Sequence, residues 1–309
     1  MTNMENHKIL ILSQTVRDDY NLTEWKKNGV DTAITLKECN VFLRGIRRLW
    51  IKYGIPFESI WYGTWKKNLK MYDLVIINGN YLSERIPKWC RKEEKCPRII
   101  WWYWNKVSAL DNPNAIKNSD AEKWSFDPED CNLYGMQFNT QYYFESFKLP
   151  KDACVENDIY YLGSNGGRTP EILAFVEEAK KQGLSLDVNI YEPKKTKWIN
   201  DADINYIVKC MDYEENLCHI GKSNAILEIV RPGQKGQTLR AMEALFHQKK
   251  LITNDVTIFE KDYYRPENIF VLGKDRISYL KDFFELPFIP VEKEIKEYYD
   301  AQNWLKRFG

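Results

Sequence analysis

Short apolar runs alternate with longer amphipathic segments along the whole chain, and this alternation constrains the fold more than any other feature. In the first half, the runs with the length and composition of strands include Ile9–Leu12, Ser59–Tyr62, Leu74–Asn78 and Ile99–Trp104. A second series opens with Asp158–Gly163 and continues with Leu186–Tyr191, Ala225–Val230, Lys250–Thr253 and Ile269–Leu272. Strands that alternate with helices are typical of α/β proteins with parallel sheets. The restart near residue 158 predicts two such domains.

The division between these domains is expected in the polar segment Leu149–Asn157, which contains Pro150. A chain of 309 residues is long enough for two domains of ordinary size. We expect an N-terminal Rossmann-like domain at residues 1–152 and a C-terminal Rossmann-like domain at residues 153–289.

Composition excludes several classes of protein. The net charge of +1 argues against a general nucleic-acid binder. The seven cysteines include no Cys-x-x-Cys pair, which favours reduced thiols in a cytoplasmic protein over disulfides or a zinc site. No apolar run approaches the length of a membrane span. We therefore expect a cytoplasmic protein.

The strongest local signal follows the apolar run Ala225–Val230. A loop that starts at Arg231 leads into a helix expected to begin near Gly236. Free backbone N–H groups and the helix dipole attract anions at such a helix start. Arg231 and Lys235 add positive charge, so the pattern predicts a phosphate or diphosphate site.

Two faces are expected on the helix after this loop. Arg240, Glu243 and His247 recur at spacings of three and four, so they share one face. That face is predicted to look toward a ligand, while the apolar residues pack in the core. The alternative is a solvated Arg–Glu pair on an ordinary helix.

A second glycine-containing loop, Gly163–Arg168, lies between an expected strand and an expected helix. Glycines there let a ligand approach the backbone, and Arg168 is suited to pair with a phosphate. The alternative is a plain turn. The loop lacks the Gly-x-Gly-x-x-Gly fingerprint, which disfavours a dinucleotide-binding oxidoreductase.

Residues 41–70 combine basic charge with tryptophans. This segment contains seven basic residues and a single acidic one, Glu58, with Trp50, Trp61 and Trp65 among them. Such a composition suits peripheral contact with an anionic membrane surface. The alternative is a solvated helix face with tryptophans in the core.

Taken together, these stretches resemble bacterial glycosyltransferases with two facing Rossmann domains, the GT-B architecture. Asp158–Gly163, Ala225–Asn254 and Tyr298–Lys306 carry the resemblance in the C-terminal half, and Ile99–Asn105 and Phe126–Gly135 carry it in the N-terminal half. More narrowly, they are similar to capsule and lipopolysaccharide biosynthesis transferases related to CgeB-like spore-maturation proteins.

The resemblance implies sugar transfer from a nucleotide-sugar donor to a saccharide acceptor, expected to be lipid-linked, in surface-polysaccharide synthesis. The C-terminal domain would bind the donor, and the N-terminal domain would face the acceptor. Glu243 matches the carboxylate that holds the donor ribose, with Arg240 nearby. The diphosphate cradle matches Gly236, Gln237 and Thr238. A C-terminal helix at residues 290–309 would cross back to the N-terminal domain.

One departure concerns stereochemistry. Many retaining members carry a glutamate eight positions before the ribose-binding one, where this chain has Lys235. An inverting reaction needs a base near the acceptor hydroxyl. Asp18 and Asp19, after the first strand, are the candidates, with surface turn residues as the alternative.

Metal and cofactor binding are not expected. Asp201 and Asp203 resemble a metal-binding Asp-x-Asp pattern, but an aspartate at this place suits a helix cap. The three histidines are scattered along the chain. A competing interpretation of the whole chain is a non-catalytic nucleotide-sugar-binding or scaffold protein of the same pathway.

Overall fold

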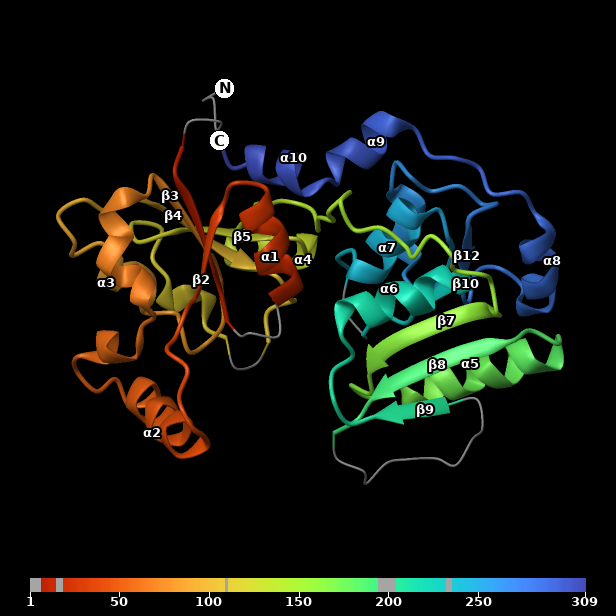
Figure 1. Ribbon diagram of the computed structural model, residues 1–309, viewed down its shortest axis with the longest axis horizontal. Coiled ribbons are helices and arrows are strands. Elements are labelled where there is room, and N and C mark those ends of the chain that lie inside the picture. Colours follow the sequence, from red (N-terminus) through yellow and green to blue (C-terminus); the bar gives the residue numbers. More distant parts are fainter. Residues whose placement is uncertain (1–6, 15–18, 109–110, 194–203, 232–234) are drawn as a thin grey trace. The chain divides into compact units, whose positions relative to one another are not determined.

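The computed structural model describes residues 7–14, 19–108, 111–193, 204–231 and 235–309. The chain divides into two compact units, Met1–Thr140 with Leu305–Gly309, and Gln141–Trp304. Each unit contains a six-stranded sheet whose strands pair in parallel. The predicted α/β class with two Rossmann-like domains is confirmed (Figure 1).

The first unit contains strands β1 to β6 and helices α1 to α4. The strands are Ile9–Ser13, Asp31–Ile34, Leu74–Asn78, Arg98–Tyr103, Glu122–Ser125 and Gln137–Phe138. The helices are Asp19–Lys27, Val41–Lys52, Ile86–Cys90 and Pro128–Tyr134. The strand order is β2-β1-β3-β4-β5-β6. Every residue of β1 is buried, as expected of an inner parallel strand covered on both faces.

The second unit contains strands β7 to β12, helices α5 to α9 and the first four residues of α10, up to Trp304. The strands are Asn157–Ser164, Leu186–Tyr191, Ile204–Ile207, Ser223–Glu228, Lys250–Thr253 and Ile269–Val271. The helices are Thr169–Lys181, Tyr213–Gly221, Leu239–His247, Leu280–Glu285, Lys293–Tyr298 and Ala301–Lys306. None of the helices in the described ranges is long and apolar enough to cross a bilayer.

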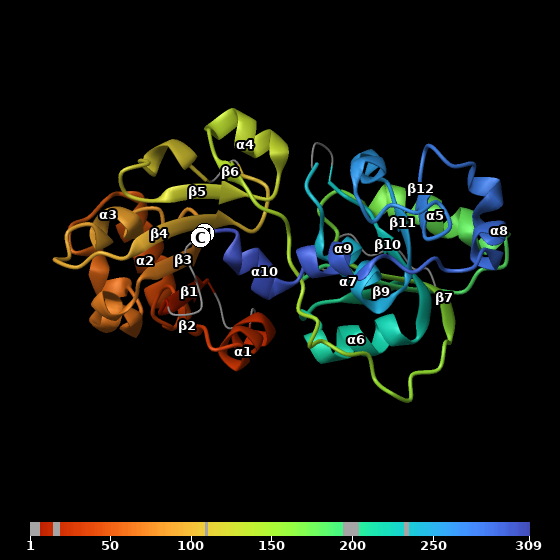
Figure 2. The ribbon, with the colours of Figure 1, turned by 90° about the horizontal axis from the view of Figure 1, so that it is seen from above.

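The strand order of the second unit is β12-β11-β10-β7-β8-β9. The chain therefore moves from β7 toward one edge and then returns to build β10 to β12 on the other side. Right-handed crossovers in opposite directions place their helices on opposite faces of a sheet. Accordingly, α5 and α6 lie on opposite faces (Figure 2).

The C-terminal segment is shared between the units. The expected final helix is two short helices, α9 and α10, and the first unit includes only Leu305–Gly309. There Phe308 is fully buried, with its ring centroid 4.8 Å from that of Trp124. The predicted return of this segment to the N-terminal domain is therefore confirmed for its last residues.

The compact units divide after Thr140, earlier than the expected end of the N-terminal domain at residue 152. The intervening residues pack within the second unit. Tyr143 exchanges backbone hydrogen bonds with Tyr299 and Ala301, at 3.0 and 2.8 Å, and the Tyr142 ring lies 4.3 Å from that of Trp304. These contacts explain the earlier division.

Two local predictions in the first unit are wrong. The apolar run Ser59–Tyr62, predicted as a strand, lies mostly in a 3-10 helix, Glu58–Trp61. Thr35 and Glu38 have the spacing of a capping box, which predicts that the helix starts after Thr35, but the Thr35 hydroxyl instead donates to the Ser13 carbonyl at 2.7 Å. Asn40 caps α2 instead, accepting a hydrogen bond from the Leu43 amide at 2.9 Å.

Candidate functional site

The second sheet has its topological switch point between β7 and β10, which are neighbours although their connections leave in opposite directions. The segments that follow these two strands, residues 165–168 and the described residues 229–231 and 235–238, therefore lie at the carboxyl edge of the sheet. Ligands of open α/β sheets bind at such a point. These are the two loops that the sequence predicted as binding loops.

Arg168 joins the two loops to each other. Its Nη1 donates to the Ile229 carbonyl at 2.6 Å, and its Nη2 donates to the Ser164 carbonyl at 2.6 Å and to the Ser164 hydroxyl at 3.2 Å. The guanidinium is thus largely committed to backbone carbonyls. The geometry gives Arg168 a positioning role, where the sequence predicted contact with phosphate.

Position 163, the next-to-last residue of β7, has no room for a side chain. A Cβ at this position would lie 2.4 Å from the Tyr161 hydroxyl and 3.3 Å from Nη2 of Arg168. Gly166 and Gly167 have φ of +48° and +85°, conformations that favour glycine. The glycines therefore shape the turn that brings Arg168 back to the strand ends.

Arg231 and Lys235 supply positive charge beside these loops. Both are exposed, and Nη2 of Arg231 is 3.5 Å from the Ser164 hydroxyl. The Lys235 carbonyl accepts a hydrogen bond from the Thr257 hydroxyl at 3.3 Å, which fixes the backbone there. Both predicted cations thus lie in the loop after β10 at the switch point.

Helix α7 begins at the same edge with a capped first turn. Thr238 is the N-cap, and its hydroxyl oxygen accepts a hydrogen bond from the Arg240 amide at 3.0 Å. The Thr238 hydroxyl also donates to Glu228, whose other oxygen accepts from Thr253 at 2.5 Å. Burial raises the pKa of Glu228, and the two hydroxyls oppose this shift. Glu228 therefore ties the start of α7 to β10 and β11.

Gly236 and Gln237, the other two residues of the predicted cradle, are buried just before the cap. Nε2 of Gln237 donates to the Tyr263 hydroxyl at 2.9 Å. This side chain therefore fixes the loop, and the N-terminal turn of α7 follows with its dipole at the switch point.

Glu243 is fully buried, whereas the sequence placed it on a face that looks toward a ligand. Its Oε1 accepts hydrogen bonds from Asn216 at 3.0 Å and Tyr213 at 3.2 Å. Oε2 lies 2.7 Å from Nη1 of Arg240, an ion pair by distance, although no described N–H points at this oxygen. Burial raises the pKa of Glu243, and Arg240 opposes this shift. Neighbouring side chains would have to move before Glu243 could contact a ribose.

His247, the third residue of the predicted face, closes a chain of hydrogen bonds along α7. Its Nε2 is 2.7 Å from the Tyr143 hydroxyl, which is 2.7 Å from the hydroxyl of Tyr213. Burial, with the nearby charges of Lys296 and Lys249, lowers the pKa of His247 to about 4. At neutral pH the imidazole is therefore uncharged, and its Nε2 shares a hydrogen bond with the Tyr143 hydroxyl.

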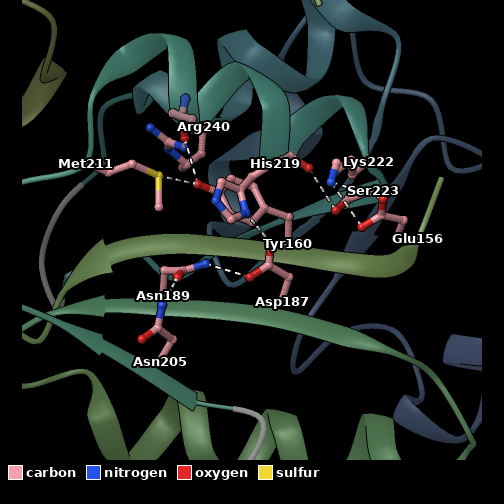
Figure 3. Close-up of polar contacts among 11 residues, drawn as sticks. Glu156, Tyr160, Asp187, Asn189, Asn205, Met211, His219, Lys222, Ser223 and Arg240 are labelled. Atoms are coloured by element: carbon pink, nitrogen blue, oxygen red, sulfur yellow. Dashed lines mark hydrogen bonds and ion pairs between the residues drawn. The ribbon is translucent and has the colours of Figure 1, made fainter. Parts of the chain in front are cut away.

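Arg240 is held from β7 and α6 as well (Figure 3). Its Nη1 donates to Oδ1 of Asn216 at 3.0 Å, and the Tyr160 hydroxyl donates to the same oxygen at 2.9 Å. The Tyr160 ring stacks on His219, whose Nδ1 is 2.5 Å from Asp187. Arg240 is thus a positioned cation, held by residues from several elements.

The remaining predicted residues lie at the limits of the described chain. Asp18, Asp201 and Asp203 fall outside the described residues, and of Asp19 the structure describes only that it begins α1. Within the described ranges, no group of three or more His, Cys, Asp or Glu side chains is arranged to hold a metal ion.

Sequence reasoning missed Glu228, Tyr160 and Asn216. A glutamate inside the apolar run Ala225–Val230 was the available signal, because such a residue is rarely buried without partners. Nothing local pointed to Tyr160 or Asn216, whose role depends on β7 and α6 lying beside α7.

No model of a protein family matches this sequence, and no curated protein matches it. Solved structures match it over almost the whole chain. HepE from Anabaena, in complex with UDP-glucose, matches with a TM-score of 0.60 at 6% identity, covering 98% of each chain. AviGT4, a glycosyltransferase involved in avilamycin A biosynthesis, has a TM-score of 0.56 at 10% identity and covers 98% of this chain and 96% of its own.

A third match is an α-glucosyltransferase in complex with UDP and a 13-mer DNA. Its TM-score is 0.52 at 12% identity, over 98% of this chain and 93% of its own. Identities this low establish the fold alone. The chain therefore has the two-domain α/β fold, GT-B, of these glycosyltransferases.

Proposed function

We propose that this protein is a glycosyltransferase whose second unit binds a nucleotide-sugar donor. The observation that carries the proposal is the switch point of the second sheet. There Arg231 and Lys235 precede the capped N-terminus of α7, and Arg168 holds the two loops together. This arrangement suits a diphosphate. HepE, which has the same fold, was solved with UDP-glucose.

The proposed chemistry places these groups at the leaving diphosphate. The bond between the anomeric carbon and the diphosphate oxygen breaks, and the acceptor hydroxyl oxygen forms the new bond and gives its proton to a base. Fixed N–H donors and cations stabilise the charge that develops on the diphosphate. We assign this role to Arg231, Lys235 and the amides of Gly236–Thr238. Asp18 and Asp19 remain the proposed base, with no metal or cofactor required.

Peripheral membrane contact through residues 41–70 is part of the proposal. On α2 and just after it, Phe42 is 75% exposed, Tyr53 70% and Phe57 82%. Large apolar side chains exposed beside basic residues suit an anionic bilayer surface. This supports a lipid-linked saccharide acceptor, a cytoplasmic protein at the membrane face, and a place in surface-polysaccharide synthesis.

A panel of sugar nucleotides, tested by thermal shift, examines the donor site. A ligand at 100 times its Kd stabilises the folded state by about 2.7 kcal/mol, which a melting curve detects. The double variant Arg231→Gln and Lys235→Gln should lose most of the shift. Lys274→Gln, an exposed lysine of the same unit, is the matched control and should keep it. Equal shifts in all three proteins would place the donor elsewhere.

The alternative function is a non-catalytic nucleotide-sugar-binding protein. Both functions need the donor site, so binding does not separate them. A transferase should slowly hydrolyse its donor when no acceptor is present, whereas a binder should leave it intact. Hydrolysis that disappears in the Arg231→Gln and Lys235→Gln variant would favour the enzyme.

A further inference from the structure

The first unit contains a pocket of about 190 Å³ at the carboxyl ends of β1, β2 and β3. Gln14 follows β1, Thr35 follows β2, and Asn80 and Ser83 follow β3. The remaining polar walls come from α2, through the side chains of Arg44, Arg47 and Arg48. Figure 1 shows α2 beyond this end of the strands of the first unit.

This pocket lies at the switch point of the first sheet. Strand β1 has β2 on one side and β3 on the other, so the connections leave it in opposite directions. Open α/β sheets bind ligands at this position. The topology therefore selects the same place in the first unit that the donor site occupies in the second.

The charge of the pocket is positive and uncompensated among the described residues. Arg44, Arg47 and Arg48 have spacings of three and four, so they share one face of α2. No described carboxylate lies within ion-pair distance of any of them, and none of the described residues that line the pocket is acidic. Three adjacent guanidinium groups repel one another unless an anion lies among them.

Two of the three guanidinium groups, those of Arg44 and Arg47, are anchored to backbone carbonyls but keep further N–H donors. Nε of Arg44 donates to the Cys39 carbonyl at 3.0 Å, and Nη1 of Arg47 donates to the Lys37 carbonyl at 2.6 Å. Nε of Arg47 is buried and has no hydrogen-bond partner among the described residues. A buried donor left unpaired destabilises the fold, so an acceptor at this atom would be strongly favoured.

Size and donor geometry define the ligand class. Sites for whole small molecules usually measure roughly 300–1,000 Å³, so this pocket suits a single group of a larger ligand. Planar guanidinium forks bind phosphate oxygens in pairs. Nε2 of Gln14 donates to the carbonyls of Asn78 and Gly79, at 3.0 and 2.7 Å, which holds that wall in place.

We propose that this pocket binds a phosphate or diphosphate group of the acceptor substrate. The anion site stands on the geometry of the first unit, and only its assignment to the acceptor rests on the proposed function. Phe42 and Leu49, seven residues apart on the opposite face of α2, are both exposed. The phosphate can thus belong to a lipid-linked or to a soluble saccharide.

Inorganic diphosphate tests the anion site directly. Hydrogen exchange with and without diphosphate should show protection in residues 35–50, separate from any protection in residues 229–240 of the donor site. Titration is best made in the Arg231→Gln and Lys235→Gln background, which removes donor-site binding. In that background Arg47→Gln and Arg48→Gln should each weaken diphosphate binding by about tenfold or more, because each removes charge-assisted hydrogen bonds. Lys52→Gln, the same charge change on α2 outside the pocket, should leave binding unchanged.

Equal diphosphate affinity in all of these proteins, or no protection in residues 35–50, would overturn the proposal.

Two further ligands, a short-chain alkyl diphosphate and a sugar 1-phosphate, distinguish the two sources of the phosphate. Tighter binding of the alkyl diphosphate that is lost in Phe42→Ser indicates a lipid-linked acceptor, and tighter binding of the sugar phosphate indicates a soluble one. Diphosphate binding without any sugar-nucleotide binding would refute the proposed function and leave the anion site intact.

Discussion

Replacing Arg168 by alanine distinguishes two roles for this residue. In the structure it links the two loops, whereas the sequence predicted that it contacts a phosphate. In the structure, Arg168 joins the carbonyls of Ser164 and Ile229, each at 2.6 Å, across the ends of β7 and β10. Its removal leaves both carbonyls without this partner. We therefore expect Arg168→Ala to destabilise the second unit and to loosen the two loops together.

The expected loss of stability follows from the two hydrogen bonds of Arg168 to backbone carbonyls. Hydrogen bonds to charged groups contribute roughly 1.5–3 kcal/mol each, which sets an upper limit of about 6 kcal/mol. Arg168 is only half-buried, so water replaces part of what is lost. We expect a loss of about 2–4 kcal/mol in the free energy of unfolding of the second unit. Arg168→Lys, which can reach one carbonyl, should lose about half as much.

The assay combines chemical denaturation with hydrogen exchange, because a two-unit chain need not unfold in one step. Exchange should increase in β7, β10 and the loops that follow them. Arg276→Ala, an exposed arginine of the same unit, is the matched control. If Arg168→Ala is as stable as this control but binds sugar nucleotides much more weakly, Arg168 is a phosphate ligand and the structural reasoning is refuted.

Three further predictions concern the second unit. Burial lowers the pKa of His247 to about 4, so protonation of this residue favours the unfolded chain. The free energy of unfolding should therefore be highest above pH 6.5 and should fall by up to roughly 3 kcal/mol as the pH drops toward 4. Urea unfolding at pH 7 and pH 4.5 should show a smaller fall in His247→Gln. Nζ of Lys250 donates to three backbone carbonyls at 2.7–2.9 Å. Lys250→Met should therefore lower the free energy of unfolding, on the order of 1–3 kcal/mol for each carbonyl left unpaired, and with it the melting temperature. An unchanged melting temperature would contradict this. Glu228→Ala should destabilise the start of α7 and weaken donor binding, while Glu228→Gln, which keeps an acceptor for Thr238, should retain both, as exchange and calorimetry can check.

Parts of the fold were predictable because they depend on short-range patterns. Three strands have the predicted bounds, since each is a compact apolar run beside turn residues: Leu74–Asn78, Leu186–Tyr191 and Lys250–Thr253. Asp31–Ile34 was missed because its side chains are only partly apolar and none is fully buried. The run Ser59–Tyr62 was too short for its period to distinguish a strand from a 3-10 helix.

The candidate site was predictable in position but not in detail. Gly163–Arg168 and the segment from Arg231 were recognised because each joins a buried strand to a helix. The partners of Arg168 and Glu243 could not be foreseen, since they depend on β7, β10 and α6 becoming neighbours in space. Charge alone favoured a ligand for Arg168, whereas the adjacency of the strands supplied carbonyls that use most of its donors.

Phe308 affects the order in which the two units can be completed during synthesis. Its buried ring fills the core of the first unit beside Trp124, and its carbonyl is bonded by Arg98. The ribosome makes this residue only after all of Gln141–Trp304. Synthesis of the second unit is therefore complete before that of the first. Until Phe308 is made, the core of the first unit lacks one of its side chains, which reverses the usual N-terminal-first order of folding. A fragment of residues 1–140 should for the same reason need Leu305–Gly309 supplied in trans or by fusion.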